Sequence, residues 1–188
     1  MTGREIFEKY NFLIVIFCRF IKLLPRKIRI IRFNRLRKRN GKIGIFLRYA
    51  YLKSLAKSCG SNVAVMTDVY IKNIDKISIG NNVSFHPMCY IDALGGIDIG
   101  NDVSIAHGVS IISFNHGYDD NKIPIKYQKI KCGRIIVHDN VWICARATIL
   151  YNVIIGTGSI IGANSLVTHD VSDNTIVGGI PAKIIKKR

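Results

Sequence analysis

The sequence predicts an all-β solenoid of triangular cross-section, preceded by a helical N-terminal arm. The first of three observations is a period of six residues, with a second apolar or small residue standing two positions before most of the periodic ones. Two buried positions separated by one exposed residue describe a short strand, and Gly, Asn and Asp form turns between the strands. The periodic residues are Ile79, Phe85, Ile91, Ile99, Ile105, Ile111, Val137, Ile143, Ile149, Ile155, Ile161 and Val167.

The second observation is the position of the breaks in this period. The step lengthens to eight residues after Ile71 and after Ile91, and to 26 residues after Ile111. These breaks lie three hexads apart, so a three-sided solenoid places all of them at one corner, where extra residues bulge outward. Hexapeptide repeats are typical of β-helices, whose stacked coils bury a continuous core.

The third observation is an uneven charge distribution. Residues 1–60 carry sixteen Lys and Arg against two Glu, whereas residues 61–188 carry twelve Lys and Arg against ten Asp. We therefore expect a basic arm at residues 1–60 and a β-helix domain at 61–188, with a protruding loop at 115–134 and a C-terminal tail. The five cysteines form no paired motif, which predicts a reduced, cytoplasmic compartment.

The arm is expected to contain two amphipathic helices. Apolar residues recur at helical spacing from Ile6 through Tyr10, Leu13 and later positions, and Pro25 ends this helix. A second helix is expected from Ile43 to Lys57, with a basic stretch at 26–39 between the two. The apolar segment is too short to span a bilayer, and no signal-peptide cleavage site follows it.

Three roles can be weighed for the arm. Its apolar faces can cap the open end of the solenoid. The aliphatic stripe and basic cluster of residues 1–40 also suit an anionic membrane surface, which would place the protein peripherally at the inner face of the cytoplasmic membrane. Nucleic-acid binding is not expected, because the aromatic residues follow helical packing positions and form no stacking platform.

The 26-residue interruption is where we expect catalytic or binding residues, because long loops inserted into a regular scaffold are usually functional or disordered. It opens with the segment SFNHGYDD, so His116 stands where the coil gives way to the loop. Histidine titrates near neutrality and is the commonest general base. The alternative for His116 is an ordinary solvated residue. His107, at a corner, is a second candidate base, whereas His138 is expected to be solvated.

Several motifs together resemble the hexapeptide-repeat O-acetyltransferases that modify sugars, polysaccharides or xenobiotics, including maltose and galactoside acetyltransferases. They are YIDALGGIDIG, SFNHGYDD, the VWI motif and the GGIPAK tail, within residues 62–186. The resemblance implies a left-handed parallel β-helix, a homotrimer with active sites between subunits, acetyl-CoA as acyl donor and no metal. It also implies direct attack of an acceptor hydroxyl on the thioester, with His116 as general base.

The resemblance further assigns binding residues. Trp142, Ala145, Ala163, Thr168, Lys183 and Lys186 match positions that contact acetyl-CoA, and His86, Asp92 and Asn115 are expected to contact the acceptor. Two residues depart from the family pattern. Cys144 stands where Gly is usual, and His169 replaces a common Lys, which would weaken phosphate binding when the imidazole is neutral.

The predicted function is acetyl transfer to a sugar hydroxyl of a cell-surface glycan or its precursor, with an acceptor that the basic arm suggests is lipid-linked. One alternative is an acyltransferase whose acceptor is a small molecule, either a xenobiotic or an amino sugar. Two further alternatives are a zinc carbonic anhydrase of the same coil type and a non-catalytic scaffold. The zinc enzyme needs three converging histidines, and the pair five residues apart that its loop requires is missing.

Overall fold

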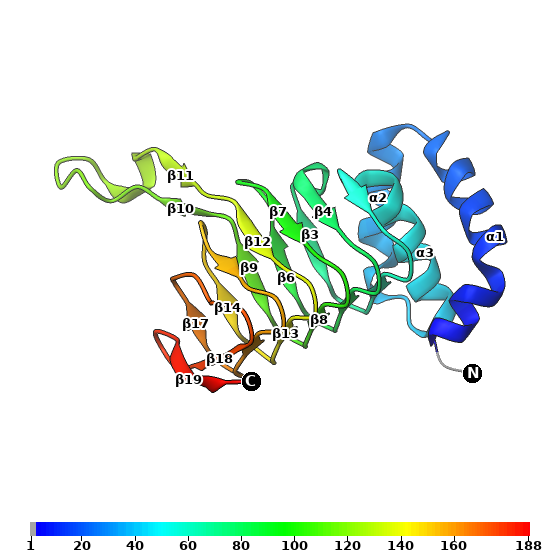
Figure 1. Cartoon of the computed structure of the whole chain (residues 1–188). Coiled ribbons are helices and arrows are strands. Elements are labelled where there is room, and N and C mark those ends of the chain that lie inside the picture. Colours follow the sequence, from blue (N-terminus) through cyan, green and yellow to red (C-terminus); the bar gives the residue numbers. More distant parts are fainter. Residues whose placement is uncertain (1–2) are drawn as a thin grey trace.

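The computed structural model is a parallel β-solenoid with helices at one end of the stack and the C-terminal strands at the other (Figure 1). It describes the backbone of residues 3–188 and the side chains of Phe12 and residues 14–188. Five complete coils of three strands are followed by a partial sixth. The predicted all-β solenoid with a helical N-terminal region is therefore confirmed.

Three parallel sheets form the sides of the prism, and successive strands of each coil belong to sheets A, B and C in turn. Sheet A contains β1 (Ser58–Cys59), β4 (Ile77–Ile79), β7 (Ile97–Ile99), β12 (Ile135–Val137) and β15 (Ile154–Ile155). Sheet B contains β2 (Ala64–Val65), β5 (Ser84–Phe85), β8 (Ser104–Ile105), β13 (Trp142–Ile143), β16 (Ile160–Ile161), β18 (Thr175–Gly178) and the antiparallel β19 (Lys183–Lys187). Sheet C contains β3 (Tyr70–Lys72), β6 (Tyr90–Asp92), β9 (Ser110–Ile112), β14 (Thr148–Ile149) and β17 (Leu166–Val167).

The strand register confirms where the extra residues lie. Along sheet A, Ser58 pairs with Ser78, Ser78 with Asp98, Asp98 with Ile136, and Ile136 with Ile154. The corner from sheet C to sheet A, called the C–A corner below, therefore absorbs every insertion. It contains the short helix η2 (Ile74–Lys76) and the long loop. The corner from sheet B to sheet C, the B–C corner, has the same length in the first five coils.

The core is the stack of periodic residues predicted from the sequence. All twelve of them are at most 4% exposed. Complete burial of one such aliphatic side chain stabilises the fold by about 1.5–3 kcal/mol. Because each coil covers the next, this core runs the whole length of the solenoid.

The corners from sheet A to sheet B are closed by hydrogen bonds between successive coils. The Asn101 side chain accepts from the backbone N–H of Asn81, and the Asp139 carboxylate accepts from that of Asn101, at 2.9 and 2.7 Å. Asn82 and Asp102, with φ near +57°, turn the chain at these corners, because Asn and Asp tolerate the left-handed conformation. The turn residues of the sequence thus fix the stacking distance.

Three helices form the helical cap, residues 3–55: α1 (Gly3–Lys22), α2 (Arg26–Arg35) and α3 (Gly41–Leu55), with the turn η1 (Leu36–Lys38). The two predicted helices are present, but the basic stretch expected between them is itself helical, as α2 and η1. The side chains of Ile6, Tyr10 and Leu13 lie outside the described residues. Strand β1 already belongs to the first coil, two residues before the predicted boundary at 60.

The capping role predicted for the arm is confirmed by α3. Its side chains donate hydrogen bonds to main-chain carbonyls that the first coil leaves without a neighbouring coil. Arg48, only 1% exposed, donates to the carbonyl of Val65 at 2.8 Å, and Lys53 donates to that of Cys59 at 3.0 Å. The Tyr49 hydroxyl donates to the carbonyl of Gly60 at 3.0 Å. Polar donors close this end because buried carbonyls need partners.

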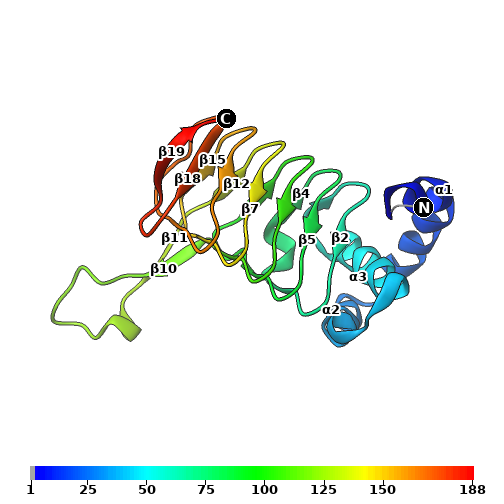
Figure 2. The same ribbon diagram turned by 90° about the horizontal axis from the view of Figure 1, so that it is seen from below.

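The loop at 115–134 projects from the side of the stack as a long extension (Figure 2). It begins with β10 (Phe114–His116), which pairs antiparallel with β11 (Ile130–Cys132), and contains the turn η3 (Ile125–Tyr127). The Gln128 side chain donates to the carbonyls of Asp120 and Ile123 at 2.8 Å. The base of the loop is thus a two-stranded ribbon, and its tip is closed by hydrogen bonds of its own.

Candidate functional site

The B–C corner gathers one group of predicted site residues into a column. The backbone N–H of Arg146 donates to the carbonyl of His107 at 2.9 Å, and that of Asn164 donates to Ala145 at 2.9 Å. His107, Ala145 and Ala163 therefore stack in successive coils of the same corner, and His86 lies at that corner in the preceding coil, one position earlier. Ala145 is half-buried and Ala163 is exposed, so these two positions present only a methyl group at the surface of the corner.

Trp142 lies beside this column, on the outer face of sheet B. It pairs with Ser104 in the coil below and Ile160 in the coil above, and it is 50% exposed. Ile160 pairs with Ile176, which pairs with Lys186 of β19. Trp142 and Lys186 thus stand in one row across four strands, about 14 Å apart at the usual spacing of neighbouring strands. An aromatic ring and a cation mark the two ends of this row.

The predicted phosphate-binding residues lie near the last coil. Lys183 and Lys186 are exposed on β19, and Lys183 pairs with Gly178. Thr168 follows β17 at the C–A corner, and its hydroxyl is 2.8 Å from Nδ1 of His169. Lys183 and His169 line a cleft of about 290 Å³ between the last coil and β19. Thr168 therefore stands on a different corner from Ala145 and Ala163.

The Cys144 side chain is half-buried at the B–C corner, directly before Ala145. Burial raises the pKa of its thiol. The thiol is therefore held in the neutral form, and Cys144 acts here as a small apolar residue. All five cysteines of the chain are free thiols.

His116 lies at the other corner, at the base of the protruding loop. Its side chain is exposed, and its ring stands edge-on to that of Phe114 with 6.5 Å between centroids. The pairing of His116 with Ile130 fixes the strand that carries it. The neighbouring Asn115 side chain accepts a hydrogen bond from the His116 backbone N–H at 2.9 Å. The imidazole is thus presented to solvent from a rigid base.

Asp92 also lies at the C–A corner, one coil before the loop. The carboxylate is 4% exposed and accepts a hydrogen bond from Nδ2 of Asn73 at 2.7 Å. Its main-chain carbonyl accepts a hydrogen bond from the Ser113 hydroxyl at 2.9 Å. The sequence reasoning missed Asn73, although this residue belongs to the eight-residue step after Ile71. Asp92 therefore links the insertion that contains Asn73 to Ser113 at the start of the long loop, at the same corner that carries His116.

The structure does not bring His116 together with Trp142 within one chain. The B–C corner and the C–A corner lie at opposite ends of every sheet C strand. In the fourth coil, Ala145 lies at the first of these corners and Leu150 at the second. Five extended residues span about 16 Å, and His116 lies further out along the loop. His116, Asn115 and Asp92 thus form one group, and Trp142, Ala145, Ala163 and His86 form another.

Among the described residues, no group of three or more His, Cys, Asp or Glu is placed to hold a metal ion. Within the same residues, no helix is long and apolar enough to cross a membrane.

Comparison with known proteins agrees with the repeat architecture. The family model for the bacterial transferase hexapeptide (six repeats) matches residues 134–169. The putative lipopolysaccharide biosynthesis O-acetyl transferase WbbJ of Escherichia coli K12 is 36% identical over 90 residues, covering 44% of this chain and 46% of that protein. The chain thus spans less than half the length of this curated relative.

Solved structures resemble most of the chain. The hexapeptide-repeat acetyltransferase VCA0836 of Vibrio cholerae, complexed with acetyl coenzyme A, has a TM-score of 0.74 and 26% identity over 86% of both chains. AntD, an N-acyltransferase of Bacillus cereus in complex with dTDP and 3-hydroxybutyryl-CoA, has a TM-score of 0.61 and 28% identity over 72% of this chain and 85% of AntD.

The fold and its register define a β-solenoid protein built from hexapeptide repeats, which fit a left-handed β-helix. The chain carries the hexapeptide repeats that this family model describes, and it resembles these acetyltransferases, as the sequence motifs predicted.

Proposed function

We propose that the protein is an acetyl-CoA-dependent O-acetyltransferase that modifies a sugar hydroxyl of a cell-surface glycan or its precursor. The observation that carries this proposal is the row from Trp142 to Lys186 beside the column of small corner residues. A straight track of small side chains, with an aromatic ring at one end and cations at the other, suits a long donor that carries phosphates. The similarity to VCA0836 and WbbJ supports the same reading.

Each binding residue has a physical role in this proposal. The pantetheine arm of acetyl-CoA would lie along Ala145 and Ala163, where a larger side chain would cover the main chain. Lys183, Lys186 and Thr168 would bind the phosphates, because charge-assisted hydrogen bonds to phosphate are strong. Trp142 would pack against the end of the donor that carries the acetyl group.

His116 would act as the general base. Its imidazole accepts the proton of the acceptor hydroxyl while the hydroxyl oxygen attacks the thioester carbonyl carbon. The carbon–sulfur bond breaks, and the departing coenzyme A sulfur receives that proton from the imidazolium. No acyl-enzyme forms. Proton transfer by a positioned base contributes about 10²–10⁴ in rate, and Asn115, Asp92 and His86 would position the acceptor.

The two residue groups lie on different corners of one chain, so the proposed site needs a second copy of the chain. We propose a homotrimer in which the loop carrying His116 of one subunit approaches the B–C corner of its neighbour. Closed rotational symmetry then repeats the same heterologous contact three times. Each trimer would contain three equivalent sites, each made by two subunits.

We also place the reaction in the cytoplasm, at the inner face of the cytoplasmic membrane, with a lipid-linked glycan as acceptor. Residues 1–40 would contact the membrane surface. The strongly basic composition of residues 1–60 supports this location.

The test of this function combines kinetics with donor binding. The variant His116→Ala is expected to lose at least about 100-fold in kcat, while its Kd for acetyl-CoA, measured by calorimetry, stays within twofold of the wild type. His138→Ala is the matched control, because His138 is also an exposed histidine of the solenoid, at a corner between sheets A and B. Full activity of His116→Ala would overturn the assignment of the base.

A second candidate is acyl transfer to the amino group of a small-molecule acceptor such as an amino sugar. The similarity to AntD favours this alternative, because AntD is an N-acyltransferase bound to dTDP and an acyl-CoA longer than acetyl. Incubating the protein with acetyl-CoA and a panel of glycans, free sugars and nucleotide-linked amino sugars would separate the two candidates. NMR of the product locates the acyl group on oxygen or on nitrogen.

A further inference from the structure

In the part of helix α1 whose side chains are described, residues 12 and 14–22, two faces are apolar and one of them is covered. Ile14, Cys18 and Ile21 are at most 8% exposed, since they pack toward the rest of the helical cap. On the opposite side, Phe12 and Phe20 are 77% and 64% exposed, and Leu23, which directly follows the helix, is 79% exposed. We call these three residues the outer row. Both views place α1 on the outside of the cap, away from the solenoid (Figures 1 and 2).

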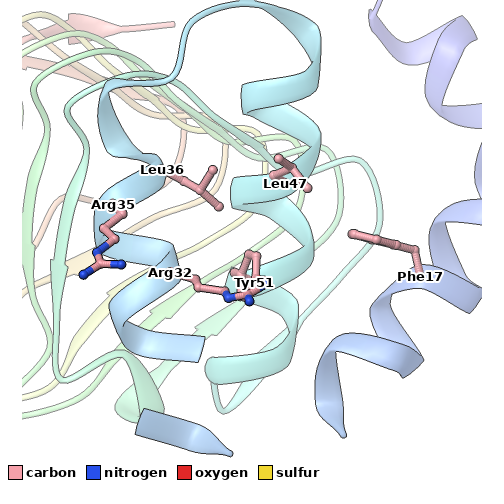
Figure 3. Close-up of a pocket in the computed structure, with 6 residues that line it drawn as sticks. All are labelled: Phe17, Arg32, Arg35, Leu36, Leu47 and Tyr51. Carbon is pink, nitrogen blue, oxygen red and sulfur yellow. The ribbon is translucent and has the colours of Figure 1, made fainter. Parts of the chain in front are cut away.

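A groove lies between α1 and α2, and α3 forms its floor (Figure 3). It has a volume of about 290 Å³ and is lined by Phe17, Arg32, Arg35, Leu36, Leu47 and Tyr51. Phe17 of α1 packs on Phe46 of α3 with 5.1 Å between ring centroids. The Arg32 guanidinium donates to the Tyr51 hydroxyl at 3.4 Å, and Arg35 is exposed at the rim. The groove therefore combines apolar walls with two cations.

Among the described residues of the cap every charged side chain is basic, and one of them, Arg26 of α2, pairs with Asp75 of the solenoid at 2.9 Å. The only acidic residues before Asp68 are Glu5 and Glu8, whose side chains lie outside the described residues. Helix α2 adds Ile28 and Ile31, which are 40% and 50% exposed, among its basic residues. Aliphatic and aromatic side chains interspersed with Lys and Arg are typical of helices that lie in the plane of a membrane interface.

We propose that the outer surface of the helical cap docks on an anionic phospholipid bilayer. The outer row of α1 enters the boundary between headgroups and acyl chains. In the groove, a lipid phosphate binds Arg32 and Arg35, while the adjoining acyl chain packs against Phe17 and Leu47. This arrangement orients the solenoid away from the bilayer, because α3 joins the cap rigidly to the first coil.

The experiment is flotation of the purified full-length chain with vesicles of phosphatidylcholine alone or with phosphatidylglycerol added. Binding is expected only to the anionic vesicles and is expected to fall with rising salt, because salt screens the headgroup charge. Arg32→Gln/Arg35→Gln is expected to lower the partition coefficient about 30-fold, since each basic residue at such a surface contributes about fivefold. Lys122→Gln/Lys126→Gln, at the tip of the protruding loop, is the matched control for loss of charge.

The apolar contribution is tested separately. Phe12→Ser/Phe20→Ser/Leu23→Ser is expected to lower binding at least about tenfold, with an unchanged melting temperature because the outer row is exposed. Ile123→Ser/Ile125→Ser, on the protruding loop, is the control. Hydrogen exchange with vesicles present is expected to show new protection of α1 and α2 amides only.

Four results would overturn this proposal. They are equal binding to neutral vesicles, wild-type binding by both cap variants, binding to duplex DNA without binding to vesicles, and burial of the outer row between copies of this chain in solution. None of them depends on acetyl transfer. They would remove the membrane location from the proposed function, on which this inference rests, but they would leave the proposed acetyl transfer untouched.

Discussion

Replacing Arg48 by Met tests how the helical cap closes the solenoid. The Arg48 side chain donates to the carbonyl oxygens of Val65, Leu36 and Arg39 at 2.8, 2.9 and 2.7 Å. Met is also unbranched, but it is apolar and donates no hydrogen bond, so the substitution removes the side-chain donor from all three carbonyls. Hydrogen bonds from a charged donor contribute about 1.5–3 kcal/mol each.

Part of that gain is offset in the wild type, because the charged guanidinium is buried. Burial lowers the pKa of Arg48, and the nearby Asp68 carboxylate opposes this shift. Leaving a buried carbonyl without its donor typically costs about 1–3 kcal/mol. We therefore expect Arg48→Met to lower the free energy of unfolding by about that amount.

The assay is urea unfolding followed by circular dichroism at one fixed protein concentration, because subunit association would add to the measured stability. Arg35→Met is the control, since Arg35 is exposed on α2. A loss below about 0.5 kcal/mol in Arg48→Met, the range of ordinary surface substitutions, would refute the reasoning. Such a result would mean that the first coil does not need these donors.

Two further substitutions test the corners. Gly80→Ala is expected to lower stability by about 1–3 kcal/mol, because an added Cβ would lie 2.5 Å from the carbonyl oxygen of Gly100 in the next coil; an unchanged urea midpoint would contradict this. Hydrogen bonds from Asn101 lower the pKa of the Asp139 carboxyl, so its charge stabilises the fold above about pH 4 and this contribution is lost as the pH falls further. Melting curves of Asp139→Asn between about pH 5 and 2.5 are therefore expected to vary less with pH than those of the wild type, and identical pH profiles would show that the hydrogen bonds do not stabilise the charged form.

The core and the position of the loop were predictable because they follow from local periodicity. The residues around Ile105 and Ile143 alternate with period two, and their spacing of six fixes the side of the prism. The same register also carried a signal for the separation of the proposed site residues. Trp142 directly precedes the second periodic residue of its coil and so lies on a sheet B strand, whereas His116 follows the third periodic residue of another coil and lies at the C–A corner.

Other features depend on long-range packing that no local pattern encodes. Arg48 sits among many basic residues, and its burial follows from which carbonyls the first coil leaves open. The outer row with Phe12 and Phe20 was missed because α1 is apolar on both faces. Periodicity indicates such a helix but does not say which face is covered. The partner of Asp92, Asn73, lies in another coil and becomes its neighbour only by stacking.

The most direct test of the central claim is complementation between two inactive variants. His116→Ala removes the proposed base, and Ala145→Trp obstructs the proposed donor track. The two variants are unfolded and refolded together in equal amounts, with each variant refolded alone as the control. In a trimer with heterologous contacts, half of the subunits retain His116 and half retain Ala145, so about one quarter of the interfaces are intact. Acetyl transfer by the mixture at about a quarter of the wild-type rate is the expected result. No recovery beyond that of the separate variants, although mixed trimers form, would contradict a site shared between subunits.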